Sequence, residues 1–216
     1  SRLLNLAINP VVAVQLSESL SLAGGVSANY GDVELQRGIA LPGDQFSFRG
    51  DGWAPGFNFG VLWVPLEQLS FGFVYRSGFT LDFEGDVNTR PGGRALPGSA
   101  EFELPRTMTF GVSYRPSPTW NFEFNLDYAD WDTLDTVTLR SAGGDVPLVF
   151  NWQSSFMYEF GVSYALSDTL DLSLGYMYSE NSSPARDFNP SVPDSDRHVI
   201  SAGIGYHSDR WTLDLA

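Results

Sequence analysis

The chain has 216 residues, a formal net charge of −14 and no cysteine. Its 26 acidic residues greatly outnumber its 12 basic ones, all of them arginine, which excludes the basic patches that bind nucleic acid. Aromatic residues make up 14% of the chain and charged residues only 18%, a balance typical of a lipid-facing band. No apolar run reaches the length of about 20 residues that a transmembrane helix needs, so a membrane-embedded fold would have to be a closed β-barrel.

Period-two alternation of apolar residues starts close to the first residue. It predicts one strand over residues 4–16, a tight turn at Ser17-Glu18-Ser19 and a second strand from Leu20 to about Gln36. The stretch Arg37–Asp51 is rich in Gly, Pro and Asp and is interpreted as a long loop.

The stretch from Gly50 to Asp86 predicts a hairpin with one aromatic face and one polar or small face. The aromatic face holds Phe57, Phe59, Val61, Trp63, Phe71, Phe73 and Tyr75. Asn58 and Arg76 have the opposite parity. A second long loop is expected over Val87–Ser99.

The same alternation continues over residues 107–114, 120–128, 156–164, 170–178 and 198–206, and a last strand begins at Arg210. Short turns and long loops alternate between these segments, and we expect about ten strands in all. Two girdles of Trp and Tyr are expected, one beside the short turns and one, including Tyr30, Trp53, Trp131 and Trp152, toward the long loops. A soluble β-sandwich would not explain this regularity. The sequence therefore predicts an all-β fold, an antiparallel up-and-down transmembrane β-barrel forming one domain over residues 1–216.

The polar faces of the strands would line the barrel lumen, and four of their residues are candidate ligand-binding residues: Asn58, Arg76, Glu123 and Glu159. A charge inside a barrel is costly unless it is paired or hydrated. Two interpretations of Arg76 are open: a structural arginine–carboxylate network that rigidifies the wall, or a cation that holds a substrate carboxylate.

Other chemistry is weakly indicated. His198 lies near Ser201, as in barrel-borne lipases, but no orienting acid and no Gly-x-Ser-x-Gly elbow accompany the pair. The acids Asp127, Asp130, Asp132 and Asp135 lack EF-hand spacing, and we interpret them as solvated acids at an external rim. The sequence predicts no enzyme, no metal site and no cofactor.

Five segments stand out as a set: GDGWAPGFNFGVLW, FGFVYRSGFTLDFEGD, ELPRTMTFGVSYRPSPTWNFEFNLDYADWDTLD, YEFGVSYALSDTLDLSLGYMYSENSSP and VPDSDRHVISAGIGY. Together they resemble the FadL family of outer-membrane transporters for long-chain fatty acids, and its TodX-type relatives for aromatic hydrocarbons. They occur in the family's order. The resemblance implies a fourteen-stranded barrel closed by an N-terminal hatch, of which this chain would supply the fourth to thirteenth strands. Both chain ends also fall inside predicted strands, so we expect a fragment that lacks the hatch and several strands.

The resemblance further implies passive uptake of hydrophobic molecules, most of all long-chain fatty acids, across a Gram-negative outer membrane. The partners would be a hydrophobic small-molecule substrate, outer-membrane lipid and lipopolysaccharide. We expect a monomer that binds no nucleic acid. The loops matching the family's substrate-capture groove offer four apolar residues: Ile39, Leu41, Phe46 and Phe48. A general diffusion porin for polar solutes is the main alternative, and a barrel-borne lipid hydrolase is a third.

Overall fold

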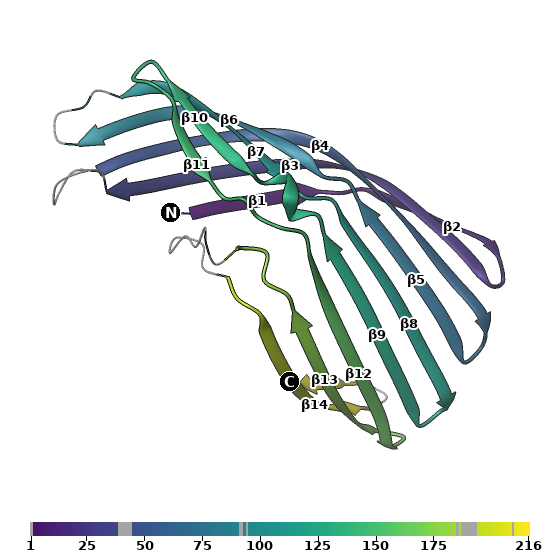
Figure 1. The fold of residues 1–216 in the computed structure, drawn as a ribbon. Coiled ribbons are helices and arrows are strands. Elements are labelled where there is room, and N and C mark those ends of the chain that lie inside the picture. Colours follow the sequence, from purple (N-terminus) through teal and green to yellow (C-terminus); the bar gives the residue numbers. More distant parts are fainter. Residues whose placement is uncertain are drawn as a thin grey trace.

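The computed structural model describes residues 2–38, 45–90, 93, 95–184, 186, 194–208 and 210–216. These residues form fifteen strands, all joined in one antiparallel sheet, and a single short 3-10 turn. The sheet curves strongly along its width (Figure 1) but does not close on itself within the described residues. No helix in this part of the chain is long and apolar enough to cross a membrane.

Ten strand paths form the curved wall, in agreement with the number expected from the sequence. The first path is β1 (Arg2–Ile8) followed by β2 (Val11–Ser17), because both pair with β3 in one register and are separated only at Asn9-Pro10. The others are β3 (Leu20–Gly38), β4 (Gln45–Leu66), β5 (Leu69–Arg76), β8 (Thr107–Ser117), β9 (Trp120–Ala129), β12 (Ser155–Ser167), β13 (Leu170–Ser179), β14 (Arg197–His207) and β15 (Thr212–Leu215).

Four further strands lie beyond one end of the wall, where the sequence predicts loops. They are β6 (Phe79–Arg90), β7 (Leu96–Leu104), β10 (Thr136–Ser141) and β11 (Val146–Val149), and the 3-10 turn η1 (Trp131–Thr133) precedes β10. The loop predictions over Arg37–Asp51 and Val87–Ser99 are therefore wrong for most of their length. β3 and β4 extend into the first, and β6 and β7 extend into the second (Figure 1).

Glycine content caused this error, because these glycines permit close strand packing rather than loops. A Cβ atom added to Gly50, in the first predicted loop, would lie 2.9 Å from the carbonyl oxygen of Glu84 on β6. One added to Gly98, in the second, would lie 2.5 Å from the Cγ2 atom of Val87 on β6 and 3.2 Å from the carbonyl oxygen of Arg140 on β10. A glycine inside a strand often marks such a close approach of a neighbouring backbone.

The two faces of the wall differ in the way that the alternation predicts. Aromatic side chains on neighbouring strands stack on the outward face, with ring centroids 5.4 Å apart for Trp63 and Phe71 and 4.6 Å apart for Trp120 and Tyr164. Most large outward side chains remain exposed, including Phe57, Phe59, Trp63, Phe110, Phe122, Phe160 and Ile200. Since a continuous apolar band of this kind needs an apolar surrounding, this face is suited to lipid.

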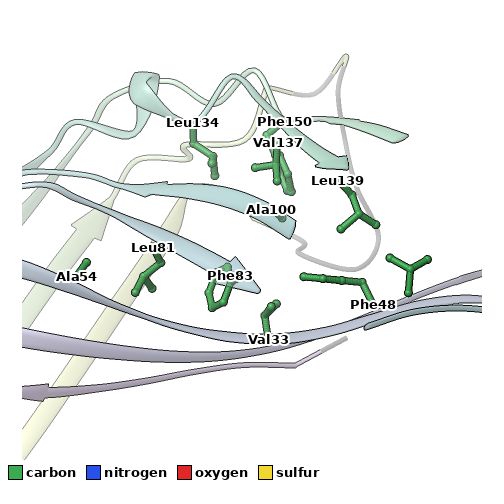
Figure 2. Close-up of a cluster of buried hydrophobic side chains, with 11 residues drawn as sticks. Val33, Phe48, Ala54, Leu81, Phe83, Ala100, Leu134, Val137, Leu139 and Phe150 are labelled. Carbon is green, nitrogen blue, oxygen red and sulfur yellow. The ribbon is translucent and has the colours of Figure 1, made fainter. Parts of the chain in front are cut away.

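A hydrophobic core lies above the wall, between the extended strands and the β10–β11 hairpin (Figure 2). Phe48, Leu81 and Phe83 come from β4 and β6 and are almost completely buried. Leu134, Val137, Leu139 and Phe150 cover them from the opposite side (Figure 2). The core occupies the inward side of the sheet, because Ala54 and Phe48 share the parity of Asn58 along β4.

Trp131 and Trp152 pack against this core rather than standing in a girdle. Their rings meet edge to face with centroids 4.7 Å apart, and both are partly buried. The prediction that they belong to the interfacial girdle is therefore wrong. Tyr30 and Trp53, also assigned to that girdle, lie together on the outward face with ring centroids 5.0 Å apart.

Candidate functional site

The inward face of the wall is the candidate functional surface. Arg76, the last residue of β5, pairs with Asn58 on β4 and with Thr107 on β8. Its side chain is exposed on this face. Within the described part of the chain, the guanidinium of Arg76 has no hydrogen bond or ion pair. Four other arginines have ion pairs: Arg2 with Asp32, Arg106 with Asp130, Arg140 with Glu101 and Arg197 with Asp194.

The inward carboxylates of Glu123, Glu159 and Asp127 contact nearby amide and hydroxyl groups and do not contact Arg76. Glu123 accepts a hydrogen bond of 2.7 Å from the amide of Asn121. Glu159 lies 3.5 Å from the amide nitrogen of Asn125, and Asp127 accepts a hydrogen bond from Thr109. The four predicted lumen residues thus share one face but form two groups: Asn58 with Arg76, and Glu123 and Glu159, which lie two and three strands along the sheet from Arg76. The structure shows no arginine–carboxylate network at Arg76 among the described residues.

The predicted capture residues have a different environment from the one expected. Phe48 is fully buried in the hydrophobic core, and Phe46 is partly buried beside it. Both belong to β4 rather than to a loop. Ile39 and Leu41 lie outside the described residues. An open apolar groove is therefore not present at Phe48, because β10–β11 and the segments flanking it already cover that side chain.

Several core residues were not recognised from the sequence. Leu81, Phe83 and Val87 share a parity along β6, and an alternating pattern over Phe79–Val87 was available to find them. Leu134 and Phe150 carry no periodic signal, since they flank the hairpin outside the strands. Gly31 makes room for this packing: a Cβ atom there would lie 2.7 Å from Leu81 and 2.9 Å from Phe83.

His198 and Ser201, the two candidate residues for hydrolysis, lie on opposite faces of the sheet. His198 has its Nδ1 atom 2.8 Å from the hydroxyl of Tyr176 on the outward face. Ser201 pairs with Gly175 and has the opposite parity, so it faces inward. The two side chains cannot form a nucleophile–base pair, which needs direct hydrogen-bond contact. The Nε2 atom of His207 contacts the carboxylate of Asp171 near the short turns.

The acidic residues at the end of β9 and just after it have different environments. Asp127 faces inward on β9, whereas Asp130 is buried and binds Arg106 together with the hydroxyls of Tyr128 and Ser154, each at 2.9 Å. Burial alone would raise the pKa of Asp130. Hydrogen bonds with Asp132, Tyr128 and Ser154 and the charge of Arg106 outweigh burial and lower this pKa to about 2. Asp130 therefore ties the ends of β8, β9 and β12 together, and no cluster of three metal-ligating side chains occurs among the described residues.

Comparison with known proteins decides the family. All 216 residues match the family described as outer membrane protein transport protein (OMPP1/FadL/TodX). The chain belongs to this family. It is 26% identical over 220 residues to the long-chain fatty acid transport protein of Escherichia coli O6:H1, which covers 93% of this chain and 47% of that relative. The 47 kDa outer membrane protein of Pasteurella multocida is 25% identical and covers 90% of this chain and 50% of that relative. The chain thus spans about half the length of these relatives.

Solved structures share the fold of this chain. A FadL homologue from Pseudomonas aeruginosa matches with a TM-score of 0.86 and 18% identity, covering 98% of this chain and 58% of that one. The toluene transporter TbuX from Ralstonia pickettii matches with a TM-score of 0.73 and 15% identity, covering 99% and 61%. The predicted antiparallel β-barrel fold and the family resemblance are confirmed. Membership in this family assigns the chain to the outer membrane of Gram-negative bacteria.

Proposed function

We propose that the protein containing this chain carries hydrophobic small molecules, above all long-chain fatty acids, passively across the outer membrane. Such molecules partition poorly into water and cross the polysaccharide leaflet slowly. A lumen with a few polar anchors and some apolar surface lowers that barrier without an energy source. We further expect a monomer surrounded by phospholipid and lipopolysaccharide.

The observation that carries this proposal is the guanidinium of Arg76 on the inward face, which is exposed and has no partner among the described residues. An exposed cation of this kind is hydrated in the absence of a ligand and can pair with an anionic one without first breaking an ion pair. A guanidinium binds a carboxylate through two parallel hydrogen bonds. Asn58, its cross-strand neighbour, can donate a further hydrogen bond from its carboxamide. We infer that Arg76 and Asn58 hold the carboxylate of a fatty acid during passage.

The test compares an anionic with a neutral ligand. Arg76→Ala is expected to weaken binding of oleate roughly tenfold or more, the scale of a lost charge-assisted hydrogen bond, and to change binding of a neutral alkane much less. Arg140→Ala is a matched control, because Arg140 pairs with Glu101 away from the inward wall. Equal weakening of both ligands by Arg76→Ala would favour a structural role for Arg76.

Transport rather than hydrolysis also agrees with the positions of His198 and Ser201 on opposite faces. We therefore propose that the protein is not an enzyme. Hydrolysis of a lipid ester by the purified protein, lost in His198→Ala, would contradict this.

A further inference from the structure

The inward face carries its charges very unevenly. On β2, β3, β4 and β5, between Arg76 and the short turns, every inward residue is uncharged; among them are Gln15, Ala23, Gly60, Leu62, Gly72 and Val74. The inward carboxylates all lie on later strands: Glu123, Asp127, Glu159, Asp171 and Asp214. We call the first surface the uncharged wall; it consists of the inward residues of β2, β3, β4 and β5 between Arg76 and the short turns. We call the second the acidic wall; it consists of the inward residues of β9, β12, β13, β14 and β15.

The uncharged wall begins directly at Arg76. Val74 precedes Arg76 by one inward position on β5 and pairs with Gly60 on β4. Leu62 follows on β4 and is 48% exposed, although it lies on the face turned away from lipid. An exposed leucine on an inward surface is a ready contact for an apolar ligand, since covering it removes apolar area from water.

Gly72 leaves open space beside these residues. A Cβ atom added there would have no other atom within 4 Å, and Gly72 pairs with Leu62. At most other glycines of the sheet, an added Cβ would meet a neighbour much more closely, as at Gly25, where it would lie 2.5 Å from the carbonyl oxygen of Pro10. Among the described residues, the wall beneath Arg76 is therefore uncharged, and no side chain occupies the space beside Gly72.

We propose that the alkyl chain of a long-chain carboxylate lies along the uncharged wall, against Val74, Gly72 and Leu62, with its carboxylate at Arg76. This inference rests on the proposed function and adds the ligand's orientation, with the tail directed toward the short turns. The acidic wall is the less favourable location. It repels the carboxylate, and an alkyl chain there would displace water from Glu123 and Glu159.

A rival location exists on the acidic wall and makes the proposal testable. Met157, Met177 and Val199 also face inward, and Met177 pairs with both Glu159 and Val199. Gly161 lies next to this group on β12, and a Cβ atom added there would have only an ordinary contact of 3.7 Å with the Cβ of Glu123. Gly72 and Gly161 are thus two open inward glycines, one on each wall.

The experiment places a leucine at each of these glycines in the full-length protein and measures oleate binding in detergent. Gly72→Leu is expected to weaken binding at least tenfold, because its side chain occupies the site of the alkyl chain. Gly161→Leu is expected to change binding less than twofold. Both variants should keep the circular dichroism spectrum and thermal midpoint of the parent, since both positions are open.

Each other outcome has a defined meaning. Unchanged binding in Gly72→Leu, or a larger loss in Gly161→Leu, overturns the inference while leaving the proposed function intact. A misfolded Gly72→Leu variant contradicts the open space at Gly72 and also overturns it. Parent protein that binds no oleate overturns the proposed function, and the inference with it. As a second variant, Val74→Asp would place a carboxylate beside Arg76 and should weaken oleate binding more than oleyl alcohol binding.

Discussion

Replacing Phe48 by alanine tests whether the end of the sheet beyond the wall is a packed core or an open ligand groove. The ring of Phe48 is completely buried. Removing a buried phenylalanine ring costs about 3–5 kcal/mol of stability. We expect a value in the upper part of this range. The would-be Cβ atoms of Gly50 and Gly98 lie 2.8 Å and 3.7 Å from the ring, and two glycines have no side chains with which to fill the cavity.

The loss should be local, because the wall strands pair independently of the core. In hydrogen exchange, amides of β6 and β10 should exchange faster in Phe48→Ala, whereas those of β9 and β12 should be unchanged. Phe57→Ala is the matched control, since Phe57 is 53% exposed on the outward face and its loss leaves no internal cavity. Unchanged exchange together with a selective loss of oleate affinity would show that Phe48 lines a binding groove and would refute the packed-core interpretation.

Two further predictions concern the ion pair of Asp130 and the pairing of β4 with β6. Asp130→Asn should lower the thermal midpoint at pH 7 by the equivalent of about 1–3 kcal/mol, since it leaves Arg106 without its ion-pair partner. The pKa of Asp130 is lowered in the folded state, so its contribution to stability is present above the unfolded-state pKa near 4 and is lost as the pH falls toward 2. The melting curves of parent and variant should therefore converge in acid. A constant difference between them would contradict this. Gly85→Val should prevent normal pairing of β4 with β6, because its Cβ atom would overlap the carbonyl oxygen of Arg49. Gly144→Val is the control: it lies in an exposed turn where an added Cβ atom meets nothing, so it should cost only the strain of its positive φ. Equal protease resistance of both variants would show that the close approach of β4 and β6 is not required.

The wall of this fold could be predicted from the sequence because its signal is local. Side chains alternate with period two along each strand, and in a barrel wall this alternation alone decides which face meets lipid. Phe59, Asn58 and Arg76 lie on the faces that their parity indicates. The number of wall strands followed from the same pattern.

The hairpins beyond the wall could not be predicted because their signal is not local. Gly50 and Gly98 are typical of loops when read along the chain. The close approaches that require them, to Glu84 of β6 and to Val87 of β6 and Arg140 of β10, exist only once these strands are paired. The burial of Phe48 likewise depends on Leu139 and its neighbours, which lie some 90 residues later in the chain.

The candidate site was predicted only in part, for a similar reason. Parity alone indicated that Arg76 faces inward. Its lack of a partner depends on the register of three strands and on the hydrogen bonds that Glu123 and Glu159 make with nearby asparagines. The strand pairing and the contact between Asn125 and Glu159 join residues far apart in the chain, and they have no trace in the sequence pattern.

Uptake by living cells tests the central claim most directly. Cells that lack their own fatty acid transporter would express the full-length protein, and uptake of labelled oleate would be measured. We predict saturable uptake well above that of cells with an empty vector, and strongly reduced uptake with Arg76→Ala. Uptake no faster than in the empty cells, with rapid entry of small polar solutes instead, would contradict the account and indicate a general diffusion porin.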